Sequence, residues 1–124
     1  MIPSEDEWYK AAYFKGGSTS AGYWVYPTRS NTAPGQDLAD VSANNANYYT
    51  APYHNPIDPP YYTTVVGEFQ NSASPYGTFD QGGNEWEWNE AVLSGSSRGS
   101  RGGAFLNDSA DYLRASYRHG VYPT

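Results

Sequence analysis

The stretch YGTFDQGGNEWEW, residues 76–88, is the most informative part of the sequence. Its two glycines and the Asn84 that follows them predict a tight turn, because glycine and asparagine adopt left-handed backbone with the least strain. After the turn, two tryptophans alternate with Glu87, so both indoles are expected on one face of a strand and the carboxylate on the other. The stretch therefore predicts a turn that leads directly into a strand.

The N-terminal segment SEDEWYKAAYF, residues 4–14, predicts the one clear helix of the chain. Ser4 and Glu7 have the spacing of a capping box, and acidic residues in a first turn favour the positive end of the helix dipole. Trp8 and the two alanines at the next helical spacings share one face. We expect this face to pack against the core.

Little regular structure is expected elsewhere. Residues 22–62 show no sustained period and contain many prolines, so a bound metal or buried aromatic side chains must hold them. Residues 96–103 are predicted as a Ser/Arg/Gly loop. Short strands are expected at residues 63–69, 104–106 and 113–117. These elements predict one domain, residues 1–124, of the α+β class with a high loop content.

The composition limits the possible functions. The chain has 13 Tyr, 4 Trp and 4 Phe, so aromatic side chains must supply much of the core. Its net charge of −6 repels phosphate backbones, so nucleic acid is not an expected partner. No run of eighteen apolar residues or signal peptide is found, so no membrane partner is expected either. Cysteine is absent, which removes disulfides, thiolate metal sites and thiol nucleophiles.

Four segments together resemble one family, the formylglycine-generating enzymes or sulfatase-modifying factors. They are IPSEDEW at 2–8, the stretch at 76–88, RGGAF at 101–105 and RASYR at 114–118. They occur in the family's order, and the first and last lie near the two ends of the chain. The resemblance implies a loop-rich, C-type-lectin-like fold. It also implies that the chain is truncated at both ends, since relatives have a long N-terminal half and a final strand.

The resemblance further implies that the family's reaction is absent. The enzymes bind copper through two cysteines, whose positions fall at or near Asn107 and within residues 110–112 of this sequence. Soft thiolates are the ligands that suit Cu(I), so no copper and no formylglycine-generating oxidase activity are expected. A related branch holds iron on three histidines, whereas this chain has only His54 and His119.

Structural calcium is the cofactor that the resemblance implies. One family site corresponds to the Asn47 side chain, the Tyr48 carbonyl, the Asp58 side chain and the Pro60 carbonyl. These groups offer the mixture of oxygen ligands that calcium uses. The alternative is that Asp58 begins an ordinary Asp-Pro-Pro turn.

A second calcium site is implied at Asn84 and Glu87, with nearby backbone carbonyls such as that of Glu85. The alternative is that Asn84 only tolerates the left-handed turn after the glycines. Other charged residues are expected to be structural. Asp108 and Asp111 are interpreted as loop carboxylates, and Arg98, Arg101, Arg114 and Arg118 as ion-pair partners of Asp80, Glu85 or Glu87.

We therefore predict a non-catalytic, calcium-stabilised binding module. The groove in which the enzymes hold a substrate peptide corresponds to Trp88, Asn107 and Tyr112, so a peptide or a small polar ligand is the expected partner. Two alternatives remain at this stage. The chain is either an enzyme with diverged metal-dependent oxidoreductase chemistry, or a structural subunit that completes a larger domain by forming a homo-oligomer.

Overall fold

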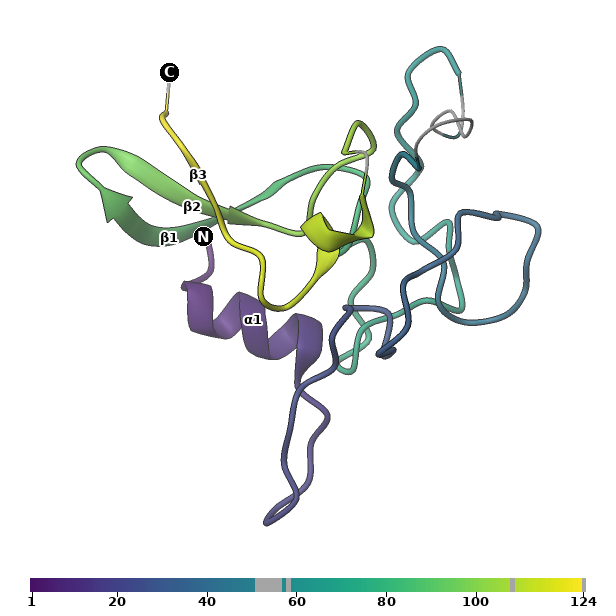
Figure 1. The fold of residues 1–124 in the computed structure, drawn as a ribbon, viewed down its shortest axis with the longest axis horizontal. Coiled ribbons are helices and arrows are strands. Elements are labelled where there is room, and N and C mark those ends of the chain that lie inside the picture. Colours follow the sequence, from purple (N-terminus) through teal and green to yellow (C-terminus); the bar gives the residue numbers. More distant parts are fainter. Residues whose placement is uncertain (51–56, 58, 108, 124) are drawn as a thin grey trace.

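The computed structural model describes residues 1–50, 57, 59–107 and 109–123. It contains the helix α1 (Glu5–Tyr13), the strands β1 (Glu87–Ser94) and β2 (Ser97–Arg101), the short 3-10 helix η1 (Ala110–Leu113) and the strand β3 (His119–Val121). The strands form one antiparallel sheet in the order β1-β2-β3. Loops form a separate lobe on the side away from the hairpin of β1 and β2 (Figure 1). The chain thus mixes one helix with a small antiparallel sheet, in agreement with the predicted α+β class.

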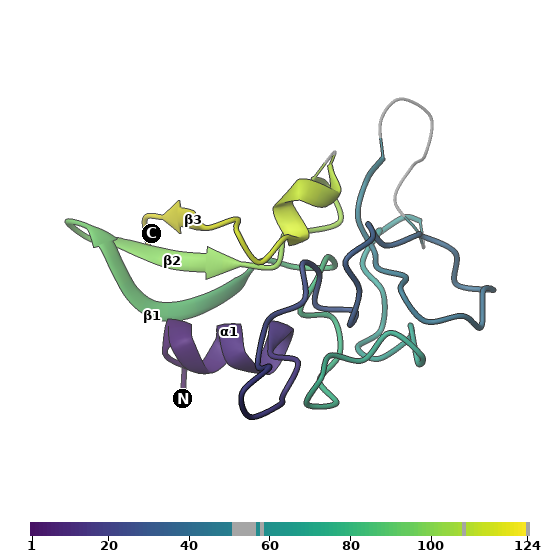
Figure 2. The same cartoon turned by 60° about the horizontal axis from the view of Figure 1, so that its bottom comes forward.

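Helix α1 forms where the sequence predicted it. The Ser4 hydroxyl accepts from the Glu7 N–H, and the Glu7 carboxylate accepts from the Ser4 N–H, which completes the capping box. Trp8, Ala12 and Tyr13 are buried, and α1 lies against the sheet on the side of β1 (Figure 2). No helix in the described part of the chain has the length and apolar character needed to cross a membrane.

Strand β2 was missed by the sequence analysis, which predicted a loop there. Small residues allow β2 to lie close to β1. A Cβ atom on Gly99 would lie 2.3 Å from Oδ1 of Asn89, and Asn89 itself is 2 % exposed. The same small residues that resemble a loop in sequence are therefore required by close packing across the strand pair.

The three other predicted strands are wrong. Residues 63–69 form turns, because the backbone of Thr64 bonds to the Asn84 side chain and not to a neighbouring strand. Residues 104–106 also lie in irregular structure, and residues 113–117 run from the end of η1 into a turn. The last strand, β3, begins later in the chain, at His119. In each case a non-local partner determines the backbone.

The core is aromatic, as the composition predicted. One cluster contains Trp8, Ala12 and Tyr13, and a second contains Tyr26, Ala46, Tyr48 and Leu113. Two tyrosine hydroxyls in these clusters have partners: Tyr13 donates to the Leu113 carbonyl at 2.9 Å, and Tyr48 donates to the Pro34 carbonyl at 2.5 Å. Tyr13 thereby joins α1 to η1, and Tyr48 holds two parts of the loop lobe together.

Alkaline pH should destabilise the fold through Tyr13. Burial raises the pKa of Tyr13 above its usual value of about 10. The stability from keeping this phenol protonated is complete below about pH 10 and is lost as the pH rises towards the folded-state pKa. Tyr13→Phe should therefore weaken the loss of stability above pH 10, while costing about 1 kcal/mol at neutral pH through the lost hydrogen bond.

Urea denaturation between pH 8 and 11 measures this effect. Burial also raises the pKa of Tyr48, so some alkaline dependence should persist in the Tyr13→Phe variant. Tyr122→Phe is the matched control, since Tyr122 is exposed. An unchanged pH profile in Tyr13→Phe would contradict the assignment.

Candidate calcium sites and ligand surface

The turn at residues 82–84 is bonded to three distant segments. The Asn84 N–H donates to the Asn47 carbonyl at 2.7 Å, and the Asn84 carbonyl accepts from the Phe105 N–H at 2.9 Å. The Asn84 side chain accepts from the Thr64 N–H and donates to the Thr64 carbonyl. Asn84 has a φ of +62°, so the predicted left-handed turn is confirmed. Asn47 of the first implied calcium site and Asn84 of the second therefore meet at this junction.

At the first implied site, one side-chain oxygen of Asn47 has no hydrogen-bond partner among the described residues. Asn47 is 1 % exposed, and its Nδ2 donates to the Tyr62 carbonyl at 2.8 Å, which brings the end of the loop containing Pro60 close to it. Its Oδ1 is buried and accepts no hydrogen bond from any described residue. Asp58 lies outside the described residues. Asn47 therefore presents a buried acceptor that is typical of a metal ligand or of a site for water.

At the second implied site, the three expected residues differ in their hydrogen-bond partners and in their exposure. The side-chain oxygen of Asn84 already accepts from Thr64, Glu85 is exposed, and the carboxylate of Glu87 accepts from the Trp8 indole N–H. Burial raises the pKa of Glu87, and the nearby charge of Asp80 raises it further. The negative charge of Asp80 therefore disfavours ionisation of Glu87.

Asp80 is a half-buried carboxylate that the sequence analysis did not include in the second implied site. One of its oxygens accepts from the Gly67 N–H at 2.7 Å, and burial raises the pKa of its carboxyl. No cationic side chain among the described residues pairs with Asp80 or Glu87. Nowhere in the described residues do three Asp, Glu or His side chains come together in a group that could hold a metal ion. Any cation here must also use neutral oxygens, such as backbone carbonyls.

The three predicted ligand-binding residues do not lie together. Oδ1 of Asn107 accepts from the Ala104 N–H at 2.6 Å, so this side chain stabilises its own turn. Tyr112 belongs to an aromatic cluster with Trp86, Tyr117 and His119. Ring centroids within this cluster are 4.8–6.2 Å apart, and His119 stacks on Trp86 at 4.9 Å. Trp88 is 40 % exposed and lines a different groove.

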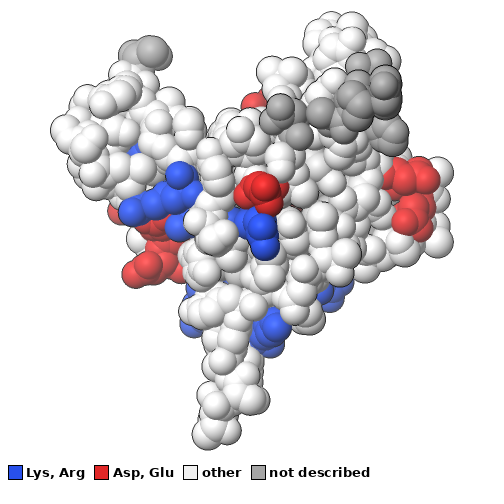
Figure 3. Space-filling model, in the orientation of Figure 1, with Lys and Arg blue, Asp and Glu red and all other residues white. Residues whose placement is uncertain are grey.

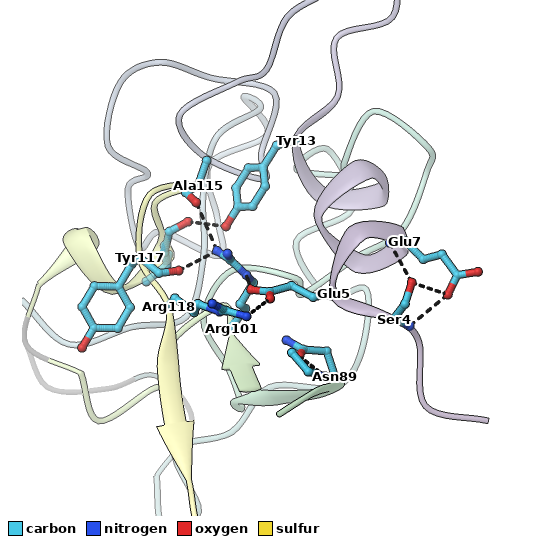
Figure 4. Close-up of polar contacts among 11 residues, drawn as sticks. Ser4, Glu5, Glu7, Tyr13, Asn89, Arg101, Ala115, Tyr117 and Arg118 are labelled. Carbon is cyan, nitrogen blue, oxygen red and sulfur yellow. Dashed lines mark hydrogen bonds and ion pairs between the residues drawn. The ribbon is translucent and has the colours of Figure 1, made fainter. Parts of the chain in front are cut away.

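The arginines pair with other acids than those predicted. Arg101 and Arg118 both contact the Glu5 carboxylate, and Arg114 pairs with Asp111 at 3.1 Å. Figure 4 shows Arg101 between α1 and the C-terminal segment, where it also donates to the carbonyls of Ala115 and Tyr117. The prediction of partners at Asp80, Glu85 or Glu87 is therefore wrong.

Charged side chains are sparse on the face seen in Figure 3, and basic and acidic groups alternate on it. This face carries no continuous basic surface of the kind that attracts nucleic acid.

Comparison with known proteins identifies the family of this chain. The sequence matches the family described as the sulfatase-modifying factor enzyme 1-like domain (FGE-sulfatase) over residues 1–124, and the chain belongs to that family. Among solved structures it is similar to Treponema denticola variable protein 1, with 26% sequence identity and a TM-score of 0.60. The similarity covers 99% of this chain and 42% of that one. No curated protein matches the sequence.

Proposed function

We propose that this chain is a non-catalytic binding module, built on a C-type-lectin-like scaffold and stabilised by calcium, that binds a peptide or a small polar ligand. The family's copper chemistry needs thiolates, and the sequence contains no cysteine. Recognition is the function that remains open to the scaffold without this metal. The proposal accounts for a chain that keeps the family's framework and lacks its copper ligands.

The buried Oδ1 of Asn47 carries the calcium part of the proposal. A buried acceptor without a partner costs about 1–3 kcal/mol, and a metal ion in contact with this oxygen would remove that cost. Calcium takes six to eight oxygens and accepts amides, carbonyls and waters beside a carboxylate. Asn47, with the carbonyls of Tyr48 and Pro60 and with Asp58, provides such a set. The ion would stabilise the loops that regular hydrogen bonding leaves unsupported.

A second calcium is proposed at Glu87, with Asp80 in the role first given to Asn84. Both carboxylates are partly buried, and each lacks a cationic partner within the described residues. A divalent cation would offset the repulsion between them. Backbone carbonyls after the glycine turn, including that of Glu85, would complete the coordination.

Calcium should raise the melting temperature of the chain. At a free concentration about 100 times the dissociation constant, one site contributes about 2.7 kcal/mol. The effect of Asp80→Asn on the melting temperature should have opposite signs in chelator and in calcium. In chelator the variant should melt above the parent chain, because it lacks a partly buried, uncompensated charge. In saturating calcium it should melt below the parent chain, because it has lost a ligand.

The two sites are separated by a second variant, Asn47→Ala, measured by differential scanning calorimetry. The quantity compared is the difference in melting temperature between calcium and chelator. Asn47→Ala and Asp80→Asn should each reduce this difference, and Asp111→Asn, which removes an exposed carboxylate, should not. Equal melting of the parent chain in calcium and in chelator would refute the calcium proposal.

The ligand surface is proposed at the aromatic cluster around Tyr112. Tyrosine and tryptophan offer large contact areas at a low entropic cost. Three rings of the cluster are half-buried, those of Trp86, Tyr112 and Tyr117, and His119 is exposed. The cluster is therefore packed against the protein on one side and accessible to a ligand on the other. Trp88 and Asn107 are then not part of this surface.

Peptides selected from a random phage library against the chain test this surface. Tyr112→Ala should weaken the selected peptides by at least about 2 kcal/mol, near 30-fold, if Tyr112 is a hot spot. Tyr61→Ala is the matched control, because Tyr61 is 80% exposed and belongs to another loop. Selected peptides that depend on Tyr61 and not on Tyr112 would move the surface elsewhere.

A further inference from the structure

A groove of about 680 Å³ lies beside β1, and none of its lining residues belongs to the aromatic cluster. Trp88 supplies its aromatic wall, and Met1, Ile2 and Pro123 supply its aliphatic walls. The Pro3 carbonyl accepts from the Glu90 N–H at 3.0 Å, which fixes the N-terminal residues alongside the strand. The volume is within the range of small-molecule sites, and its lining is largely apolar.

The sheet directs Trp88 away from α1. Glu87 contacts Trp8 of α1, and neighbouring residues in a strand point to opposite faces. Trp88 therefore lies on the open face of the sheet, where it is 40 % exposed. A large exposed indole beside aliphatic side chains is suited to an apolar ligand group.

Two opposite charges, those of Glu90 and Arg98, also line the groove. Nη1 of Arg98 lies 3.5 Å from the backbone oxygen of Glu90, so the two residues are neighbours across β1 and β2. Their charged groups nevertheless do not pair with each other, and Arg98 pairs with no carboxylate elsewhere in the described residues. A guanidinium and a carboxylate are thus both available beside an apolar wall.

We propose that this groove binds a free amino acid with a large apolar side chain, held as its zwitterion. Arg98 contacts the α-carboxylate, because a guanidinium matches the planar geometry of a carboxylate. Glu90 accepts from the α-ammonium, and the side chain lies against Trp88 and Ile2. A ligand with one charge would leave either Arg98 or Glu90 without a partner. This inference goes beyond the proposed function and does not depend on the aromatic cluster or on calcium.

Fluorine NMR with L-4-fluorophenylalanine tests the proposal on the 124-residue chain. Two analogues each lack one charge: 4-fluorophenethylamine has no carboxylate, and 3-(4-fluorophenyl)propanoate has no ammonium. The amino acid should bind at least about tenfold more tightly than either analogue, because each loses a charge-assisted hydrogen bond. Arg98→Gln should reduce its affinity to that of the amine, and Glu90→Gln to that of the propanoate.

Arg29→Gln is the matched control, since Arg29 is exposed and lies in a different loop. It should leave the affinity for the amino acid unchanged. Equal binding of all three ligands would reduce the groove to an apolar contact and overturn the proposal, as would unchanged binding in Arg98→Gln. A dimer in sedimentation equilibrium that Trp88→Ala dissociates would overturn it too, because a second copy would then occupy the groove.

Discussion

Replacing Arg101 with methionine is expected to lower the free energy of unfolding by about 3–5 kcal/mol. Arg101 is 8% exposed, and its Nε donates to the Glu5 carboxylate at 2.7 Å. Its Nη1 donates to the carbonyls of Ala115 and Tyr117 at 3.1 and 2.7 Å. Methionine fills much of the same space, so the loss reflects mainly the acceptors that remain buried and unpaired. Urea denaturation at neutral pH measures it.

Arg118→Met is the control for this prediction. Arg118 contacts the same Glu5 carboxylate, but its side chain is 46% exposed, and exposed pairs contribute at most about 1 kcal/mol. The comparison separates the burial of Arg101 from its charge. Equal losses in the two variants would show that the carbonyl contacts of Arg101 contribute nothing.

Gly83→Ala is expected to destabilise the chain by about 2–5 kcal/mol. Gly83 has a φ of +81°, which costs an L-residue about 1–2 kcal/mol. The new Cβ would lie 2.3 Å from the carbonyl oxygen of Asn47, and this oxygen belongs to backbone that cannot move aside easily. Relieving such a contact costs about 1–3 kcal/mol more. The shift would also displace Asn47 and reduce the calcium stabilisation.

Gly77→Ala isolates the two contributions. Gly77 has a nearly identical φ of +79°, but a Cβ there would meet nothing within 4 Å. It should therefore cost only about 1–2 kcal/mol, from backbone strain alone. Thermal unfolding of both variants in calcium and in chelator gives the comparison. A Gly83→Ala variant as stable as Gly77→Ala would mean that the junction can move apart without loss.

The sequence predicted those parts of the fold that local chemistry determines. The capping box of Ser4 and Glu7 acts within one helical turn, so α1 could be located from the sequence alone. The turn at Asn84 depends on its own backbone preference and was also predicted. Strand β2 could not be predicted, because its small residues are required only by close packing across the strand pair, as where Asn89 lies against Gly99.

The candidate sites follow the same division. The family resemblance implied Asn47 and Glu87 as calcium ligands. In the structure Asn47 has a buried side-chain oxygen and Glu87 is half-buried, and their role as ligands stays a prediction. Asp80 was missed because its closeness to Glu87 follows from the path of the turn and not from a spacing in the sequence. The ligand residues were grouped by analogy. The structure instead combines Tyr112 with Trp86, because η1 and β1 meet there.

Arg101 holds the C-terminal segment through its main chain, so this anchor does not depend on the side chains at the two contacted positions. The guanidinium grips main-chain oxygens at positions 115 and 117, and every amino acid carries such an oxygen. The amide of residue 115 likewise donates to the Val25 carbonyl, a bond that any residue except proline can make. The side chains at positions 115 and 117 can therefore be exchanged without loss of these main-chain contacts. Such an anchor would allow one framework to present many different recognition surfaces.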